Sequence, residues 1–300
     1  PIEFAVGIFT NLSREHLDFH GTMENYLAAK AKLFDRCRVG LFNADDAAGR
    51  TLLQNARCRA VSYGLTPPCD YLAEEIESRG VRGSTYILHT KNARFRIKTQ
   101  IPGTFTLYNT LAAAAAAREC GVDLVCIQNA LYALRGIAGR LEKVNLGFAG
   151  GAFTAFIDYA HTPFALENLL RCVRAFRGTG QRIVTLFGCG GDRDKTKRPV
   201  MGEIGARLAD FVIVTSDNPR TEKPEAIIDD ILVGLKGYDT PYAVIPDRVA
   251  AIHYAMDHAQ PGDVIVLAGK GHEDYQEIDH KHYPMDERVI VAEHLKETQK

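Results

Sequence analysis

The 300-residue sequence has almost no net charge and no long apolar segment. Its formal net charge is −1 and its pI is about 6.9, so nothing electrostatic points to nucleic acid or a membrane surface. No apolar run approaches the roughly 18–20 residues that a membrane-spanning helix needs, and the N-terminus does not read as a signal peptide. We therefore expect no nucleic-acid or membrane partner.

Cysteines with paired spacing are also missing. The seven cysteines are an odd number, scattered along the chain, and none forms a CxxC pair. This pattern argues against a disulfide framework and a zinc site. It indicates a reducing, cytoplasmic setting.

No loop of the kind that grips nucleotide phosphates is recognisable. The sequence contains neither GxxxxGKS/T nor GxGxxG after a strand, and GKGHE (269–273) has too few spaced glycines to be a Walker loop. The chain opens without Met on PIEFAVGIFTNLS (1–13), which reads as the end of a buried strand. We expect a fragment whose N-terminal portion is missing.

The length suits about two domains, and the pattern changes near Gly139. From residue 140 onward apolar strands alternate with helices, which predicts an α/β domain with a mostly parallel sheet. We place the domain boundary between residues 138 and 139, with a hinge at Gly139 and Arg140. The expected strands are 153–157, 183–187, 211–215, 242–245 and 264–268, the helices are 164–177, 198–209, 224–235 and 247–259, and YQEI and RVIVA belong to an edge hairpin plus a terminal helix.

The first 138 residues contain a different mixture of elements. An alanine-rich helix at 110–120 is expected, with Asn109 as its N-cap. The other expected elements are a strand ending near Phe9, a long helix at 22–36, and strands at 39–43, 60–64, 84–90 and 95–100.

Charged loops follow three strands of the second domain and predict a ligand site. Parallel strands bring their carboxyl ends to one edge of the sheet, where loops gather polar groups over a rigid floor. Clustered charge punctuated by Gly and Pro suits a zwitterionic or phosphorylated small molecule, and the alternative is ordinary solvated loops. The residues concerned are Asp192, Arg193, Asp194, Lys195, Lys197, Arg198, Asp217, Asn218 and Arg220, with GKGHED after the third strand.

Lys30 lies on the apolar stripe of the helix expected at 22–36, three residues after Leu27 and four before Phe34. A lysine on a buried face is costly unless it is paired, neutralised or modified. The alternative is that its aliphatic stem covers the core while the ammonium reaches water. The upstream loop holds His16, Asp18 and His20, and this cluster favours a magnesium and phosphate site.

DYAHTP (158–163) directly follows a predicted strand, so Asp158 and His161 are expected at its carboxyl end. The alternative is a turn capped by Asp and closed by Pro.

Several of these segments together resemble the Mur ligases, in order and in spacing. The resemblance covers essentially the whole chain and is most specific for members that add the third residue of the peptidoglycan stem peptide. It implies the end of a central ATPase domain (1–138), without its P-loop, followed by a Rossmann-like amino-acid-binding domain (139–300). The segments are TNLSREHLDFHGTMENYLAAKAKLF, YNTLAAAAAA, GRLEKV, DYAHTP, FGCGGDRDKTKRP, DNPRTEKP and AGKGHEDYQ.

The resemblance also implies a reaction and its residues. ATP and Mg²⁺ are the implied cofactors, and meso-diaminopimelate is joined to UDP-N-acetylmuramoyl-L-alanyl-D-glutamate through an acyl-phosphate by a cytoplasmic monomer. The implied roles are carbamylation and catalysis for Lys30, metal binding for His16 and Lys30, nucleotide binding for Asn109, Arg140, Asp158 and His161 (the last also catalytic), and amino-acid binding for Arg193, Asp217, Asn218, Pro219, Arg220, Gly269 and Glu273.

The choice of meso-diaminopimelate depends on Arg220. Its planar fork can grip the distal carboxylate, which L-lysine lacks, and DNPR marks the diaminopimelate-adding members in the resembling family. Asp217, Asn218 and Glu273 can receive the distal ammonium. The alternatives are an L-lysine-adding homologue, another ligase of the superfamily such as a folylpolyglutamate or cyanophycin synthetase, and a non-catalytic ligand-binding remnant.

Overall fold

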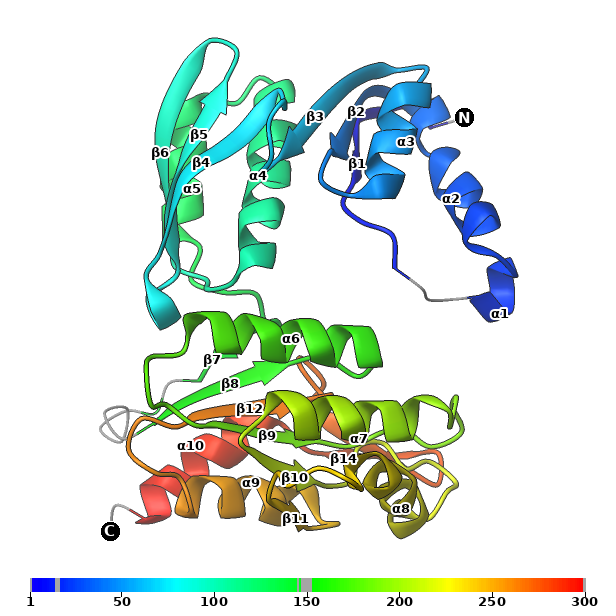
Figure 1. Cartoon of the computed structure of the whole chain (residues 1–300), viewed down its shortest axis with the longest axis vertical. Helices are drawn as coiled ribbons and strands as arrows, with labels where there is room; N and C mark the ends of the chain where they lie inside the picture. The colour runs from blue at the N-terminus through cyan, green and yellow to red at the C-terminus, as the bar shows by residue number, and fades with distance from the viewer. Residues whose placement is uncertain (1, 14–16, 145, 147–152, 299–300) are drawn as a thin grey trace. The chain divides into compact units, whose positions relative to one another are not determined.

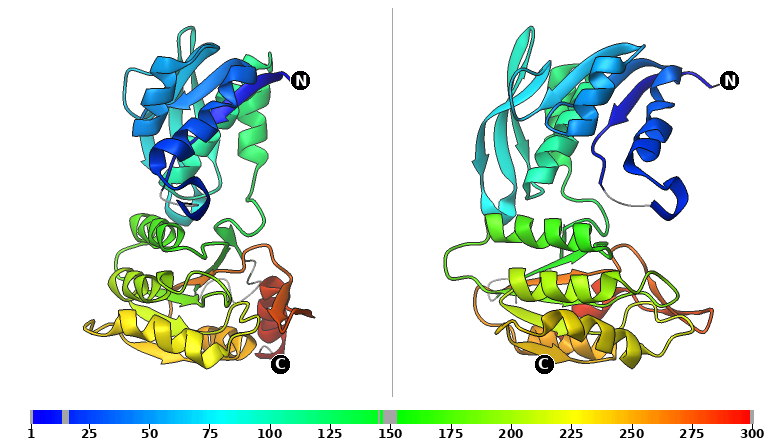
Figure 2. Two further views of the ribbon diagram at one scale, coloured as in Figure 1. Left: turned by 90° about the vertical axis from the view of Figure 1, so that its right-hand side faces the viewer. Right: turned by 45° about the vertical axis from the view of Figure 1, so that its right-hand side comes forward.

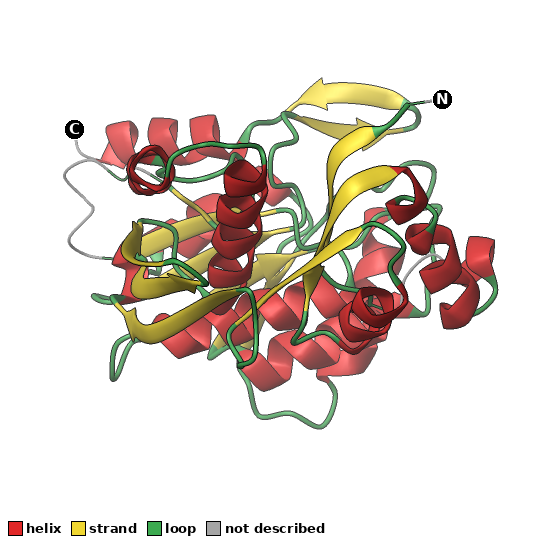
Figure 3. Cartoon of the chain, turned by 90° about the horizontal axis from the view of Figure 1, so that it is seen from above, coloured by secondary structure: helices red, strands yellow, loops and turns green. Residues whose placement is uncertain are grey.

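The computed structural model describes residues 2–13, 17–144, 146 and 153–298. The chain divides into two compact units, Pro1–Arg135 and Gly136–Lys300. Both units combine helices with strands (Figure 3). Each unit has its own buried apolar core, so each is described by itself.

The N-terminal unit is built on a six-stranded sheet of order β1-β2-β3-β4-β5-β6. The first four strands are parallel, and β4, β5 and β6 pair antiparallel. The elements are β1 (Phe4–Phe9), α1 (Leu17–His20), α2 (Met23–Ala31), β2 (Cys37–Asn43), α3 (Ala47–Asn55), β3 (Arg59–Gly64), β4 (Tyr71–Ser78), β5 (Ser84–Thr90), β6 (Ala93–Thr99), α4 (Thr104–Glu119) and α5 (Leu124–Ala133), with 3₁₀ turns at Phe34–Arg36 and Gly80–Arg82.

The N-terminal unit has apolar clusters on both faces of its sheet, as two neighbouring residues of β2 show. Leu41 joins a large cluster with residues of α4 and α5, whereas the next residue, Phe42, joins a smaller cluster with Phe34 and Leu52. Successive side chains of a strand point to opposite faces. The sheet is therefore covered by α4 and α5 on one face and by α2 and α3 on the other.

The C-terminal unit is a second six-stranded sheet of order β11-β10-β9-β12-β8-β7, parallel except for β7. A separate two-stranded hairpin, β13 with β14, follows it. The elements are β7 (Glu142–Lys143), β8 (Thr154–Asp158), α6 (Pro163–Phe176), β9 (Ile183–Phe187), α7 (Lys197–Leu208), β10 (Phe211–Val214), α8 (Pro224–Leu235), β11 (Tyr242–Val244), α9 (Arg248–Asp257), β12 (Val264–Ala268), β13 (Tyr275–Ile278), β14 (Lys281–Pro284) and α10 (Glu287–Thr298).

Helices cover both faces of this sheet (Figures 1 and 2). Helices α6, α7 and α8 lie side by side on one face, where the rings of Phe156 in β8 and Phe176 in α6 are 5.6 Å apart. Helices α9 and α10 cover the other face, where Ile252 and Val291 share a cluster with strand residues such as Leu186. Strands buried on both faces read as continuous apolar runs, which is how β9 and β12 appear in the sequence.

The mixed α/β architecture with mostly parallel sheets confirms the expected fold class. The helix expected at 22–36 was too long, because α2 ends at Ala31. The expected hairpin and terminal helix are confirmed: YQEI lies in the hairpin Tyr275–Pro284, and RVIVA lies inside α10. The expectation missed five helices and strands, α1, α3, β4, α5 and β7. The second half of β4 is exposed and acidic, so it carries no apolar alternation that could predict a strand.

Candidate functional site

The polar loops of the C-terminal unit meet at one edge of its sheet. Strands β10, β9, β12 and β8 are parallel neighbours, so their carboxyl ends lie together. The backbone N–H of Gly269 donates to the carbonyl of Asp158 at 2.9 Å and joins the ends of β12 and β8. The hairpin also reaches this edge, because the Nε2 of Gln276 donates to the carbonyl of Asp217 at 2.6 Å.

A hydrogen-bonded trio of Asn218, Lys270 and Glu273 lies at the centre of this edge. The fully buried ammonium of Lys270 donates to Asn218 Oδ1 and to Glu273 Oε2, both at 2.7 Å. The Nδ2 of Asn218 donates to the same Glu273 oxygen at 3.0 Å. The trio joins the loop after β10 to the loop after β12, so the two predicted substrate segments are hydrogen-bonded to each other.

Asp217 presents an acceptor that the described residues leave unsatisfied. It is 7% exposed, and its Oδ1 accepts from the backbone N–H of Asn218 at 2.7 Å, whereas its Oδ2 is buried without a hydrogen-bond partner in the described part of the chain. A buried polar atom without a partner costs about 1–3 kcal/mol. The arrangement suits a ligand that brings an N–H donor, such as an ammonium.

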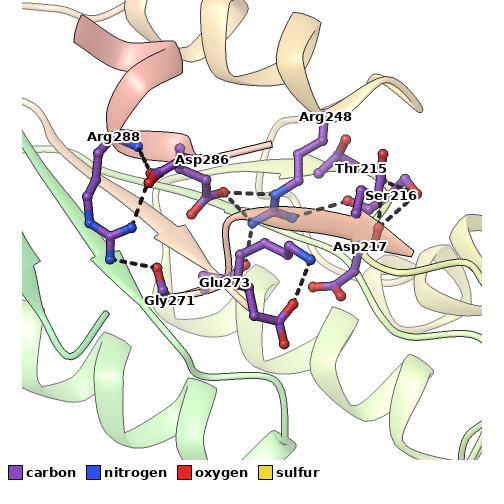
Figure 4. Close-up of polar contacts among 12 residues, drawn as sticks. Thr215, Ser216, Asp217, Arg248, Gly271, Glu273, Asp286 and Arg288 are labelled. Carbon is purple, nitrogen blue, oxygen red and sulfur yellow. Dashed lines mark hydrogen bonds and ion pairs between the residues drawn. The ribbon is translucent and has the colours of Figure 1, made fainter. Parts of the chain in front are cut away.

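Gly269 makes room for that carboxylate. Its φ is +116°, and a Cβ at this position would lie 2.6 Å from Asp217 Oδ2. Both the backbone conformation and the space favour glycine here. Figure 4 shows Asp217 and Glu273 among the residues at this edge of the sheet.

Arg220 is already engaged within the protein. Its Nε is 2.9 Å from Glu277 Oε2, and its NH1 donates to the carbonyl of Gly191 at 2.8 Å. The backbone of Arg220 has a φ of +52°, and its N–H donates to the carbonyl of Glu277 at 3.1 Å. The preceding Pro219 is buried. A substrate carboxylate would therefore have to share Arg220 with Glu277 or displace it.

The charged residues of the loop after β9 have separate roles. Arg193 is exposed, and its NH1 donates to the carbonyl of Asp192 at 3.0 Å, so its side chain is available to a ligand. Arg198 is fully buried and pairs with Glu222 at 2.8 Å and Asp230 at 2.9 Å. Its guanidinium lowers the pKa of Glu222 to about 2. The loop is thus partly a structural ion-pair network and not wholly a ligand cluster.

The carboxylate of Asp158 caps a turn. Its oxygens accept from the backbone N–H groups of Leu141 at 2.6 Å and Ala160 at 2.9 Å. Burial raises the pKa of Asp158, although these donors and Arg140 oppose the shift. The geometry matches the alternative of a turn capped by Asp.

Arg140 and His161 gather around a residue that the sequence did not single out, Tyr159. The guanidinium carbon of Arg140 is 5.1 Å from the centre of the Tyr159 ring, and the His161 ring is 4.6 Å from it. The His272 ring lies 5.3 Å away on a third segment. Aromatic and basic groups are therefore concentrated beside the end of β8.

The predicted residues of the N-terminal unit are less buried than expected. No residue of α2 is fully buried; Lys30 is half-buried, and its Nζ lies 4.9 Å from the Tyr26 ring centre. This partial burial matches the alternative in which the aliphatic stem of Lys30 covers apolar residues, and burial of Lys30 in the complete enzyme stays a prediction. His16 lies outside the described residues. The described residues contain no group of three or more His, Cys, Asp or Glu that could hold a metal ion.

The expected capping role of Asn109 was also wrong. Helix α4 begins at Thr104 with Gly103 as its N-cap, so Asn109 lies within the helix, where it is exposed. The alanine run gave no sign that the helix extends so far toward Pro102 and Gly103. The side chain of Asn109 is exposed and therefore accessible to a ligand.

Sequence reasoning also missed a buried ion pair behind the site. The Nε of Arg248 donates to Glu287 Oε1 at 2.9 Å, and both side chains are fully buried. The other nitrogens of Arg248 donate to the carbonyls of Ser216 at 3.2 Å and Ala268 at 2.8 Å, at the starts of both substrate segments (Figure 4). Burial raises the pKa of Glu287. No sequence signal pairs residues 39 positions apart.

Comparisons with known proteins assign the fold and these segments to one class of enzyme. Residues 1–117 match the Mur ligase middle domain, and residues 139–271 match the Mur ligase glutamate ligase domain. The chain belongs to the Mur ligase family.

The names of similar relatives describe a narrower group of ligases than the family does. The chain is 44% identical over 296 residues to a UDP-N-acetylmuramoyl-L-alanyl-D-glutamate–2,6-diaminopimelate ligase of Clostridium acetobutylicum, covering 99% of this chain and 60% of that protein. It is 44% identical over 299 residues to the ligase of the same name from Thermosynechococcus vestitus, covering 98% and 59%. A solved structure of a ligase of that name has a TM-score of 0.67 at 35% identity, covering 99% of this chain and 61% of the other.

A more distant structure shows the same fold. A UDP-N-acetylmuramate-alanine ligase from Thermotoga maritima has a TM-score of 0.71 at 20% identity, covering 98% of this chain and 59% of the other. The chain spans about three fifths of the length of the curated relatives that it matches. In the described part of the chain, no helix combines the length and apolarity that a membrane crossing requires.

Proposed function

We propose that this chain is the greater part of an ADP-forming acid–amino-acid ligase that adds meso-diaminopimelate to UDP-N-acetylmuramoyl-L-alanyl-D-glutamate in peptidoglycan synthesis. The names of the relatives support this assignment. Residues 1–138 would be the end of the central ATP-binding domain, and residues 139–300 the amino-acid-binding domain. We further propose that the enzyme works in the cytoplasm as a monomer.

One observation supports the amino-acid site most directly. The unsatisfied Oδ2 of Asp217 lies beside the trio of Asn218, Lys270 and Glu273 at the carboxyl edge of a parallel sheet. Ligands of open α/β sheets bind at this edge. Two acidic side chains there suit an ammonium, while Arg193 and Arg220 supply cationic groups for carboxylates. Pro219 and Gly269 shape the loops that carry these groups.

The proposed reaction activates a carboxylate and then joins it to an amine. ATP phosphorylates the γ-carboxylate of the D-glutamate, and the amine of the incoming amino acid attacks the acyl-phosphate, releasing phosphate. Holding the amine in place makes the attack effectively unimolecular. The residues of the C-terminal unit would bind and orient this amino acid, and Asp158, Arg140, His161 and Asn109 would contact the nucleotide.

The proposed use of ATP and Mg²⁺ follows from the family. The described residues do not by themselves form a metal site, and Lys30 is only half-buried. We propose that carbamylated Lys30 and His16 serve the metal in the complete enzyme. Phosphate release measured with all substrates present should show no sustained turnover by this chain alone, since it contains no Walker loop.

A lysine-adding enzyme is the second candidate, because Arg220 already pairs with Glu277. The two candidates differ in whether Arg220 binds the distal carboxylate. The enzyme from the complete reading frame should be assayed with both amino acids, alongside Arg220→Ala. Comparable catalytic efficiency with L-lysine, or unchanged diaminopimelate kinetics in Arg220→Ala, would reject the diaminopimelate assignment. A GTxGKT segment encoded upstream would separate an enzyme from a non-catalytic remnant.

A further inference from the structure

We propose that Lys270 is a positioning and specificity-determining residue of the amino-acid site. It would hold Asn218 and Glu273 in place and set the charge that the distal end of the amino acid meets. This inference rests on the proposed function, because it takes the edge formed by β10 and β12 as the amino-acid site.

The burial of Lys270 calls for a specific role. Its side chain is fully buried, and its Nζ makes two hydrogen bonds of 2.7 Å, one to Asn218 and one to Glu273. The same Nζ lies 5.2 Å from the Tyr275 ring centre. A buried ammonium is unfavourable unless it is paired and hydrogen-bonded. The ammonium of Lys270 has three such neighbours, Asn218, Glu273 and the Tyr275 ring. Asn218 and Glu273 belong to the proposed substrate site.

Lys270 fixes the orientation of the Asn218 amide. The Oδ1 of Asn218 accepts from Lys270 Nζ and from the backbone N–H of Glu277, the latter at 2.9 Å. The Nδ2 must then point at Glu273 Oε2, which it contacts at 3.0 Å. An ammonium has only donors, so a flipped amide would set its own N–H groups against Lys270.

Lys270 also fixes the carboxylate of Glu273. Its hydrogen bond and that of Asn218 both fall on Oε2. Among the contacts of the described residues, Oε1 is therefore the oxygen left for a ligand. The carboxylate is held by one oxygen while the other can receive an ammonium.

The positive charge of Lys270 affects the binding of the two candidate amino acids to different extents. The distal end of L-lysine carries one positive charge, whereas that of meso-diaminopimelate carries an ammonium and a carboxylate and is neutral overall. Loss of one positive charge from the site therefore favours L-lysine relative to meso-diaminopimelate. One unit charge at roughly 7–10 Å, with an effective dielectric constant of about 20, changes the ratio of the two affinities by about tenfold or more.

The test is a calorimetric titration of the 300-residue chain with each amino acid. Lys270→Met keeps the length of the side chain and removes its charge, and we expect it to shift the ratio of the dissociation constants about tenfold toward L-lysine. Lys270→Arg keeps the charge and should retain the wild-type ratio even if both affinities fall. Lys281→Met, on the exposed strand β14, is the matched control and should leave both affinities unchanged.

A second variant covers the case in which Lys270→Met does not fold, as judged by circular dichroism. Glu273→Gln removes a negative charge at the same place and should shift the ratio in the opposite direction, away from L-lysine. Equal weakening of both amino acids in the folded variants would mean a purely structural role and would overturn the inference. In that case meso-diaminopimelate still binds the wild-type chain and the proposed function stands. A wild-type chain that binds neither amino acid would refute the amino-acid site itself, and this inference with it.

Discussion

The buried pair of Arg248 and Glu287 gives the sharpest stability prediction. Replacing Arg248 by Met leaves the carboxylate of Glu287, which is fully buried, without its counter-charge. It also removes the donors to the carbonyls of Ser216 and Ala268. Stranding a buried charge in this way costs about 3–5 kcal/mol, so we expect Arg248→Met to lower the free energy of unfolding by that amount.

Removing both charges should cost less than removing one. In the double variant Arg248→Met with Glu287→Met no charge is stranded, and the residual loss comes from the two carbonyls, roughly 1–3 kcal/mol. Arg171→Met is the surface control, because Arg171 pairs with Glu167 across one helical turn and is 57% exposed. Such exposed pairs contribute only about 0.3–0.5 kcal/mol.

Urea unfolding followed by circular dichroism measures these differences, because the sequence has no tryptophan to report by fluorescence. Hydrogen exchange in β10 and β12 assigns the loss to the C-terminal unit. A double variant no more stable than Arg248→Met, or a loss below about 1 kcal/mol in the single variant, would refute the reasoning.

The pH dependence of Arg248→Met checks the same reasoning independently. Burial already raises the pKa of Glu287 in the folded protein, and loss of Arg248 should raise that pKa further. The folded variant then binds a proton more readily than the unfolded chain, so its stability falls as pH rises through the folded-state pKa. Arg248→Met should be less destabilised near pH 5 than near pH 8, and a flat difference would contradict the account.

Three further predictions concern other parts of the chain. The pKa of Glu222 is lowered to about 2 by Arg198, so its contribution to stability is present above the ordinary value of about 4.5 and lost as pH falls toward 2; Glu222→Gln should lack this acid-dependent loss in unfolding experiments. Gly269→Ala should lower the free energy of unfolding by about 1–3 kcal/mol, because alanine is strained at a φ of +116°. It should also weaken amino-acid binding by displacing Asp217, and an unchanged affinity in calorimetry would count against that placement. Lys30→Ala should abolish ligase activity in the enzyme from the complete reading frame, with partial rescue by short-chain carboxylic acids, and near-normal turnover would rule out carbamylation.

The sequence alone predicted most of the strands and helices of the C-terminal unit. Its central strands, such as β9 and β12, are buried on both faces and therefore appear as short apolar runs. Helices α6 and α8 begin at Pro163 and Pro224, and proline is a clear signal for the start of a helix. Helix α8 was predicted at its observed bounds. These signals are local, so they can be recognised before any strand order is known. The motif order also indicated the Mur ligase family, which the comparisons confirm.

Only the tertiary structure decided how the site residues pair. Lys270 meets Asn218, 52 positions away, and Arg220 meets Glu277 because the hairpin runs back to the sheet edge. Local patterns left two readings of Lys30 open, since helical spacing shows which residues share a face but not how much of that face is covered. Pairing and burial depend on the order of the strands and on the segments packed against them, and neither is encoded in the spacing of residues along one element.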